Sequence, residues 1–210
     1  MSKIALILGL GPHIGQPTAD RLLSAGYKVA TVSRTPRIAS EEGTIHLTAD
    51  FQDPSTVEPV FDQVQQKWGS PSLVLYNAAA MCYTGENPLS APIYEFINVF
   101  NVNTTSAYAA AALVYQRDHQ VAFFYTGNAL NSMIMLPLAT AGVGKAATAH
   151  WVQAAAKSEA LRPARFYYLD ERNQQGGPAG GGISGEAHAN VIMKLAADPE
   201  QRDPLVLFQA

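Results

Sequence analysis

Short apolar runs alternate along this chain with longer segments of helical spacing, and this alternation constrains the fold more than any other feature. The runs have strand length and continuous hydrophobicity; they cover residues 3–8, 27–32, 44–49, 72–78, 121–127 and 165–171, with a short seventh at 204–209. Unbroken hydrophobicity of this kind is typical of strands that are buried on both faces. The pattern therefore predicts a parallel sheet between two layers of helices.

Segments with helical spacing fill the intervals between the runs. They cover residues 14–25, 57–68, 92–117, about 140–160 and 184–197. This alternation predicts an α/β fold of the Rossmann type, a doubly wound, mostly parallel sheet of six to seven strands with helices on both faces. No internal repeat or shift in composition divides the chain, so we expect one domain over residues 1–210.

The composition argues against several classes of partner. With 15% charged residues, a net charge of −3 and an isoelectric point near 5.9, the chain gives no electrostatic reason to bind nucleic acid or an anionic membrane. Cys82 is the single cysteine, which rules out an internal disulfide and fits a reducing compartment. The first residues are typical of a first strand and not of a signal peptide, and no run approaches the roughly 18 apolar residues of a membrane span. We expect a soluble, cytoplasmic protein without a metal site.

A glycine-rich turn follows the first predicted strand. In LILGLGPHIG, Gly9, Gly11 and Gly15 come directly after the strand and open a helix. Glycines there permit a tight turn and a close approach of the backbone to a pyrophosphate, which the free N–H groups of the helix N-terminus can bind. The turn predicts a dinucleotide site that includes His13 and Ile14, although glycines that only tighten a strand–helix turn would give the same pattern.

The end of the second predicted strand bears on the choice of cofactor. A site that selects NAD usually has an acidic residue here, which accepts a hydrogen bond from the ribose 2′-hydroxyl. This chain has Ser33 and Arg34, and its next carboxylate is Glu41. A hydroxyl and a guanidinium suit a 2′-phosphate, so the sequence predicts a preference for NADP(H) over NAD(H).

These segments, in this order, resemble the short-chain dehydrogenase/reductase family over nearly the whole chain. GLGPHIG resembles the family's G-x-x-x-G-x-G turn, with His13 in place of the middle glycine. By the same resemblance Asp50 would meet the adenine ring, Asn77 leads a segment like the family's N-A-G, and Asn103 falls on the structural and proton-relay asparagine. The resemblance implies a nicotinamide cofactor and an oxidoreductase activity.

The family's catalytic motif is present only in part. Lys145 matches the lysine of the Tyr-x-x-x-Lys motif, but Ala141 stands where the tyrosine belongs and Asn128 where the serine belongs. Leu138 occupies the tyrosine position of the more widely spaced enoyl-reductase branch. In the family the lysine holds the nicotinamide ribose and lowers the pKa of the tyrosine, which protonates the carbonyl oxygen. The resemblance therefore implies that Lys145 binds the cofactor and that the usual proton donor is missing.

Other groups are candidates for the missing step. Asn128 could donate a hydrogen bond to a developing oxyanion, but an amide cannot supply a proton. A water held by Lys145 and Asn103 could supply one. Hydroxyl groups on nearby segments are further candidates: Tyr125, Thr126 and Ser132. A tyrosine on a buried strand is, however, more often part of the core.

Two acidic residues, Asp170 and Glu171, end the sixth predicted strand, at the sheet edge where ligands bind in such folds. They could be catalytic acids, but acidic residues there more often hold a loop by pairing with Arg172 or with a backbone amide. The glycine-rich stretch 173–182 is short for the helical lid that the family places there, and it implies an open or mobile pocket.

Three functions remain open from the sequence. The first is an NADP(H)-dependent reductase that acts on a small carbonyl or enone substrate with a non-standard proton donor, and the retained Asn103, Lys145 and cofactor turn favour it. The second is a non-redox enzyme on the same scaffold, catalysing an isomerisation, elimination or cyclisation. The third is a non-catalytic NADP(H)-binding module. For all three the resemblance implies a homodimer or homotetramer through the helices around 92–117 and 140–160, with His150 on the helix face opposite Lys145.

Overall fold

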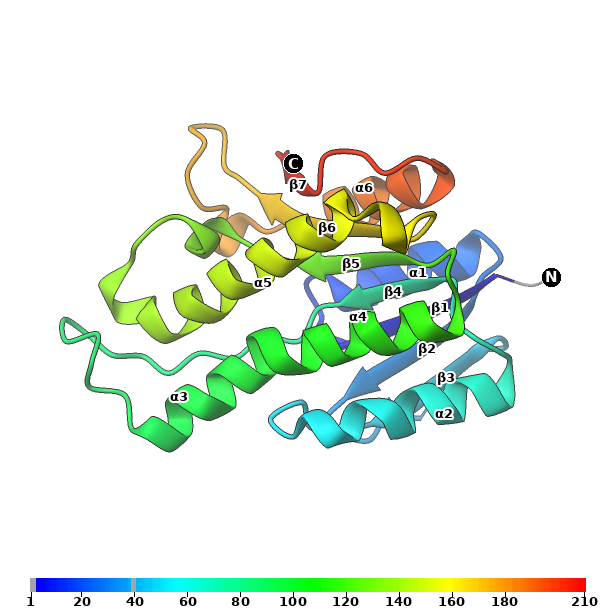
Figure 1. The fold of residues 1–210 in the computed structure, drawn as a ribbon, viewed down its shortest axis with the longest axis horizontal. Helices are drawn as coiled ribbons and strands as arrows, with labels where there is room; N and C mark the ends of the chain where they lie inside the picture. The colour runs from blue at the N-terminus through cyan, green and yellow to red at the C-terminus, as the bar shows by residue number, and fades with distance from the viewer. Residues whose placement is uncertain (1–2, 39–40) are drawn as a thin grey trace.

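The structure, a computed structural model, describes residues 3–38 and 41–210 and contains one seven-stranded sheet with helices on both faces (Figure 1). The strand order is β3-β2-β1-β4-β5-β6-β7, and each neighbouring pair is parallel. The expected Rossmann-type fold is confirmed, including the seventh strand. The single domain expected over 1–210 also includes residues 1–2 and 39–40, which lie outside the described ranges.

The elements follow the predicted alternation. The strands are β1 (Ile4–Leu8), β2 (Lys28–Ser33), β3 (Thr44–Thr48), β4 (Leu73–Tyr76), β5 (Ala122–Thr126), β6 (Arg165–Glu171) and β7 (Leu205–Phe208). The helices are α1 (Gly15–Ser24), α2 (Val57–Lys67), α3 (Ile93–Phe100), α4 (Ser106–Arg117), α5 (Ala139–Lys157) and α6 (Gly185–Ala197). The helix expected to reach residue 160 ends at Lys157, and a 3₁₀ turn, Glu159–Leu161, follows it.

Each face of the sheet has its own core, because side chains alternate along the strands. In β1, Ile4, Leu6 and Leu8 pack on the face covered by α2, α4 and α5. Ala5 and Ile7 pack on the opposite face, under α1 and α6. All five side chains are buried. Burial of both faces explains why the strands appear in the sequence as unbroken apolar runs.

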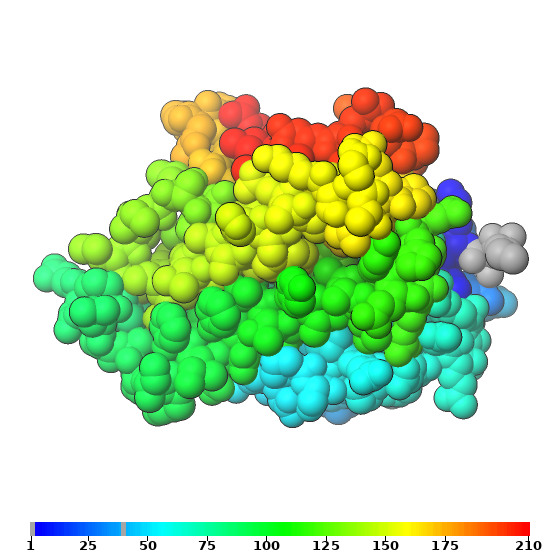
Figure 2. All heavy atoms as spheres, viewed as in Figure 1, coloured from blue at the N-terminus to red at the C-terminus, as the bar shows by residue number. Residues whose placement is uncertain are grey.

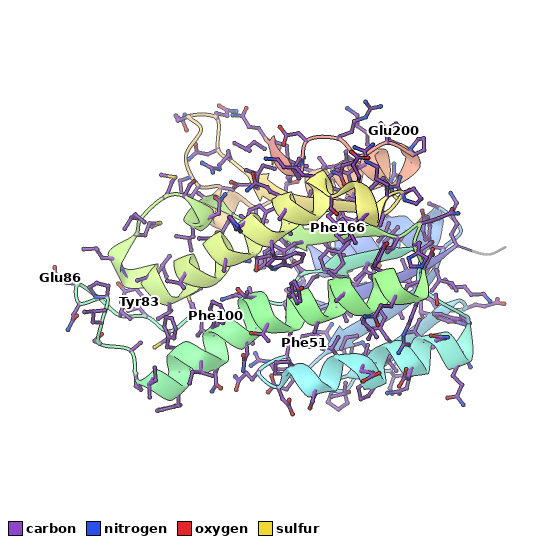
Figure 3. All side chains as sticks on the ribbon, viewed as in Figure 1. Phe51, Tyr83, Glu86, Phe100, Phe166 and Glu200 are labelled. Atoms are coloured by element: carbon purple, nitrogen blue, oxygen red, sulfur yellow. The ribbon has the colours of Figure 1, made fainter. Side chains whose placement is uncertain are left out.

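The strand order reverses between β1 and β4, and this reversal sets the place of a ligand site. The chain adds β2 and β3 on one side of β1 and then β4 to β7 on the other. Crossover helices diverge at such a point and leave a crevice at the carboxyl ends of the strands. The loop that carries Tyr83 and Glu86 and the N-terminal end of α5 extend beyond the sheet at one end of the molecule (Figure 3).

The helix expected over 92–117 contains a π-helical segment, Asn101–Thr105, between α3 and α4. The hydroxyl of Tyr125 in β5 donates to the Asn103 carbonyl oxygen at 2.8 Å, and that of Thr148 in α5 donates to the same oxygen at 2.8 Å. These tertiary bonds satisfy a carbonyl that a wider helical turn leaves free. Helical spacing alone predicts a regular helix, because the partners that favour the π segment are distant in the sequence.

Candidate functional site

Two hollows follow the carboxyl edge of the sheet. The Arg34 groove, with a volume of about 260 Å³, is lined by residues 9–11, 33–34, 49–52, 77–80 and Val102. The Lys145 cavity, with a volume of about 340 Å³, lies toward β5 and β6. Asn77 and Ala79 line both hollows, so the two adjoin past the ends of β1 and β4, and the pair is called the channel below.

The walls of the Lys145 cavity are mainly apolar, with polar groups at a few points. The apolar lining includes Ile14, Leu130, Met135, Leu138 and Ile183. The polar side chains that line it are Asn77, Thr126, Asn128, Lys145, Glu171 and His188. This combination is typical of small-molecule sites, and the volume is near the lower end of their usual range of roughly 300–1,000 Å³.

The glycine turn is packed too closely for a larger residue at Gly9 and at Gly15. Gly9 has a φ of 109°, and a Cβ there would collide with the backbone nitrogen of Ala78. A Cβ on Gly15, the first residue of α1, would lie 2.7 Å from the Gly9 oxygen. Asn77 donates through Nδ2 to the same Gly9 oxygen at 2.8 Å. The turn therefore brings the backbone and the N-terminal end of α1 to the channel, a geometry that suits a pyrophosphate.

Of the other residues predicted at the turn, Gly11 and Ile14 line the hollows and His13 does not. Gly11 lines the Arg34 groove, and the buried Ile14 lines the Lys145 cavity. His13 is exposed on the turn and lines neither. The position that matches the family's middle glycine therefore leaves its imidazole in solvent.

Ser33, Arg34 and Asp50 meet in the Arg34 groove, as a site for the adenosine part of a dinucleotide requires. Arg34 is exposed at the end of β2. Ser33 donates through its hydroxyl to the Thr35 carbonyl at 2.7 Å. Asp50 accepts from the backbone N–H of Gln52 at 3.1 Å, and its side chain is exposed at the rim. Among the described residues the Arg34 guanidinium has no ion-pair partner, and at the groove it can reach a phosphate.

Lys145 is not on a solvated helix face. It is 4% exposed, and its Nζ donates to the Thr126 carbonyl at 2.8 Å and lies 4.4 Å from the centre of the Tyr125 ring. Burial lowers the pKa of Lys145 to about 7, and the nearby charge of Asp170 opposes this change. A buried lysine with one protein hydrogen-bond acceptor has further N–H groups for a ligand in the cavity.

Asn103 lies behind the site and not in its lining. Its side chain is fully buried, donates to the Ala80 carbonyl at 2.7 Å and accepts from the Ala80 N–H at 3.2 Å. A Cβ on Gly144 would lie 2.7 Å from the Asn103 Cβ, so the π segment and α5 are in close contact. Asn103 therefore fixes the loop after β4 against α5, beside Gly144, the residue that precedes Lys145. Its side-chain amide makes one donor and one acceptor bond to the Ala80 backbone, and a water between Asn103 and Lys145 stays a prediction.

Asn128, at the position of the family's serine, lines the Lys145 cavity. Its Oδ1 accepts from the Leu130 N–H at 3.0 Å. Because the amide oxygen makes this bond, the amide nitrogen lies on the other side of the group. The hydroxyl of Tyr168 donates to the Asn128 carbonyl at 3.0 Å and holds the backbone there. The residue is thus fixed in a position from which its amide N–H₂ can donate to a ligand.

The hydroxyl candidates differ in their access to the cavity. Tyr125 is fully buried and donates to the Asn103 carbonyl, and burial raises its pKa well above the ordinary value. Ser132 is exposed and does not line the cavity. Thr126 does line it, and among the described residues its buried Oγ1 has no hydrogen-bond partner. Ala141, which stands where the resemblance places the tyrosine, is buried.

The two acidic residues of β6 have structural partners. Asp170 pairs with Arg172 at 2.5 Å, and its side chain is buried. The Glu171 carboxylate accepts from the Ser184 N–H, at 2.9 and 3.1 Å to its two oxygens, just before α6. These are the loop-holding roles that the sequence left open beside a catalytic one.

His188 is the residue of the cavity that sequence reasoning missed. It is 2% exposed, and its Nδ1 lies 2.9 Å from the Ser184 carbonyl oxygen and 3.3 Å from Glu171 Oε2. In the sequence it shares a helical face with Ile192 and Leu195, both of which are buried. A histidine on an apolar helix face is a weak signal, and its proximity to Glu171 comes from the packing of α6 against the end of β6.

The described parts of the chain contain neither a cluster of metal ligands nor a membrane-spanning helix. Within residues 3–38 and 41–210, no group of three His, Cys, Asp or Glu side chains could hold a metal ion. Among the helices of these residues, none is both long and apolar enough to cross a bilayer.

Comparison with known proteins identifies relatives of this chain. The family model described as short chain dehydrogenase matches residues 3–160. The short chain dehydrogenase/reductase dmxR12 of Cryptosporiopsis is 37% identical over 227 residues, which cover 99% of this chain and 92% of that protein. The versicolorin reductase of Emericella nidulans is 29% identical over 124 residues, or 54% of this chain and 46% of that protein.

Solved structures share the fold. A 3-ketoacyl-(acyl-carrier-protein) reductase from Brucella melitensis, complexed with NADH, has a TM-score of 0.86 at 18% identity and covers 99% of this chain and 96% of that chain. A short chain dehydrogenase from Burkholderia cenocepacia, in complex with NADP, has a TM-score of 0.82 at 18% identity with the same coverage. At this identity the likeness extends to the fold alone.

Proposed function

The chain belongs to the short-chain dehydrogenase family, and from that membership we propose that it is an NADP(H)-dependent reductase of a small carbonyl or enone substrate. The observation that carries the proposal is the pair of adjoining hollows, one lined by Arg34 and the other by the buried Lys145. A channel of this form can hold a dinucleotide along the sheet edge and leave the apolar part of the cavity for substrate.

The residues of the channel fit the parts of the cofactor. Arg34 and Ser33 suit the 2′-phosphate, and Asp50 suits the adenine side of the groove. The glycine turn and the N-terminal end of α1 suit the pyrophosphate, because a helix N-terminus offers unpaired N–H groups to an anion. Lys145 would hold the nicotinamide ribose. When bound, the reduced nicotinamide supplies the hydride.

With Ala141 in place of tyrosine, the proton comes from Lys145 itself. As the carbonyl carbon accepts hydride, its oxygen takes a proton from the Nζ ammonium, and the neutral amine regains a proton from water. A pKa of about 7 suits this role, because a group that titrates near the working pH can both give and recover a proton. The Asn128 amide stabilises the developing charge by donating a hydrogen bond to the same oxygen.

Hydride transfer is the step to test. NADPH deuterated at the nicotinamide C4, with each face labelled in turn, is incubated with the protein and a set of small ketones and enones. We expect deuterium on carbon in the product, and loss of turnover by about a hundredfold or more in Lys145→Met. Tyr125→Phe should keep most of the activity, because Tyr125 does not reach the cavity.

The same experiment separates the alternatives. NADPH binding without deuterium transfer to any substrate would contradict the reductase and favour a non-redox enzyme or a binding module. Turnover that survives in Lys145→Met but disappears in Thr126→Val would assign the proton to the Thr126 hydroxyl and contradict the role given to Lys145.

A further inference from the structure

The imidazole of His188 has a defined orientation at the wall of the Lys145 cavity. Its Nδ1 faces two acceptors, the Ser184 carbonyl oxygen at 2.9 Å and Glu171 Oε2 at 3.3 Å. Two acceptors at one nitrogen require that Nδ1 carries the hydrogen. In the neutral ring, Nε2 then has a free lone pair, and among the described residues it has no hydrogen-bond partner.

The position of this ring is rigid. Glu171 is held by the Ser184 N–H, and the Ser184 hydroxyl in turn accepts from the Ala187 N–H at the start of α6. A Cβ on Gly185 would collide with the His13 carbonyl and with Pro17, so the first turn of α6 is pressed against α1. The His188 ring also meets the Phe208 ring edge-on, with centroids 4.9 Å apart. A carboxylate–imidazole pair fixed in this way is the arrangement that orients a histidine base.

His188 and Lys145 enter the cavity from opposite faces of the sheet, since α6 covers one face and α5 the other. Burial lowers the pKa of His188, while the Ser184 carbonyl and the Glu171 carboxylate oppose the change. The imidazole is therefore a neutral base at neutral pH, and the ammonium of Lys145 is an acid in the same mainly apolar cavity. Groups whose environments assign them opposite protonation roles are typical of acid–base catalysis.

We propose that His188 and Lys145 form an acid–base pair that enolises a ketone bound in the Lys145 cavity. His188 Nε2 takes a proton from the carbon next to the carbonyl, and the electrons of the broken C–H bond form the C=C bond. The electron pair of the C=O bond moves to oxygen, which takes a proton from the Lys145 ammonium. Return of both protons restores the ketone and both residues, so the step needs no oxidant or reductant. It is independent of hydride transfer.

Neither the family match nor the hydride mechanism requires this second pair. The family model ends at residue 160, before Glu171 and His188. Glu171 acts through His188 and is a positioning residue. The enolisation would take place in the same cavity as the proposed reduction. It would form or consume the enol of the ketone that the reductase uses.

Exchange of carbon-bound hydrogen with solvent tests the proposal without cofactor. The protein is incubated in D₂O with cyclohexanone, 1-indanone or 2-tetralone, and proton NMR follows both saturation transfer from protein to ketone and loss of the signals next to the carbonyl. We expect deuterium uptake well above the buffer rate for a ketone that binds. His188→Gln and Lys145→Met should each lower the rate by about a hundredfold. His150→Gln, on the exposed side of α5, is the matched control and should leave the rate unchanged.

Nitrogen-15 spectra report on Glu171 separately. His188 in the wild type should show a protonated Nδ1 and an unprotonated Nε2, and Glu171→Gln should lose this pattern together with part of the exchange rate. Bound ketone that exchanges no faster than in buffer would overturn the proposal. So would exchange that survives in His188→Gln, or a cavity that binds none of the three ketones. Hydride transfer without exchange would leave the reductase standing and remove only the enolisation.

Discussion

At the scale of single residues, Lys145 shows how a charge can be placed in a nearly apolar site. The ammonium is buried against a carbonyl and an aromatic face, which compensate only part of its lost hydration. The pKa of about 7 reflects the remaining cost. This cost should be measurable as a dependence of stability on pH.

The sign of that dependence follows from the two pKa values of Lys145. In the folded chain the pKa is about 7 and the unperturbed value is 10.5. Between these values the unfolded chain binds more protons, so the free energy of unfolding should rise with pH, by up to about 1.4 kcal/mol per pH unit. Below pH 7 both states are protonated and the cost of burial is fully present.

Denaturant unfolding of the cofactor-free protein from about pH 6 to about pH 9 should show this rise in the free energy of unfolding of the wild type, and Lys145→Met should lose it. Equal slopes in both proteins would contradict the lowered pKa.

Arg34 carries the expected choice of cofactor. Replacing it with alanine should weaken NADPH binding by about tenfold or more and leave NADH binding nearly unchanged, because only NADPH offers a 2′-phosphate to the guanidinium. Calorimetric titration with each cofactor measures both affinities. Arg37, which lines a separate hollow between α1 and the β2–β3 edge, is the matched control, and Arg37→Ala should bind both as the wild type does. Equal losses for the two cofactors in Arg34→Ala would reject the assignment.

At the scale of elements, the strands and helices could be predicted because their signals are local. The continuous apolar runs reflect burial on two faces, and the 3.6-residue spacing reflects burial on one. The π segment at Asn101–Thr105 could not be predicted, because the hydroxyls of Tyr125 and Thr148 that both donate to its Asn103 carbonyl come from β5 and α5. A helix of small residues has no local preference that would mark the wider turn.

The end of β5 gives a test of packing at this scale. Gly127 follows β5, and a Cβ there would collide with the ring of Tyr168 in β6. Gly127→Ala should therefore destabilise the protein by about 1–3 kcal/mol, and it should reduce activity as well, because Asn128 is the next residue. Gly181→Ala is the control, since nothing lies within 4 Å of a Cβ at that position. Urea unfolding of both variants measures the difference. Equal stability of the two would show that Tyr168 can move aside at little cost.

At the scale of the whole molecule, one face carries apolar side chains that the fold leaves uncovered. Ile93 and Ile97 of α3, Tyr108 of α4 and Val143 of α5 are between 45% and 72% exposed. The Tyr108 ring meets that of Trp151 edge-on at 5.6 Å, which joins α4 to α5 on this face. Figure 2 shows the two helices side by side across the surface. An apolar surface of this kind is typical of a subunit interface.

We propose that this face joins two copies of the chain, in a homodimer or homotetramer. Light scattering after size exclusion should give a multiple of the 22.5 kDa chain mass. Tyr108→Glu together with Val143→Glu should yield a monomer, because the interface would have to bury two carboxylates. Leu207→Glu, at a comparably exposed apolar residue of β7, should keep the assembly of the wild type. A monomeric wild-type protein would contradict the proposal.

Some residues of the site could be predicted from local signals in the sequence, and the contacts of others could not. Glycines after a strand, Arg34 after another and Lys145 among small residues are each visible in a short stretch of sequence, and the structure brings Gly9, Arg34 and Asn77 to one groove. By resemblance Asn103 was expected to be a structural and proton-relay residue; its side chain bonds to the backbone of Ala80, and a role in proton transfer stays a prediction. The sequence could not predict these bonds, because Ala80 follows β4 and lies far from Asn103 along the chain.

The order of strands and helices, the parallel sheet and the glycine turn could all be predicted from the amino-acid sequence, because their signals lie in residues that are neighbours along the chain. The burial of Lys145, the bond of Tyr125 to Asn103 and the contact of His188 with Glu171 at the cavity wall are set by packing between distant elements. These contacts join elements that are far apart in sequence. The way the elements pack determines how deeply each group is buried, and burial sets its pKa and its access to the cavity. The chemistry of the site therefore depends on how α5 and α6 pack at the two faces of one sheet edge.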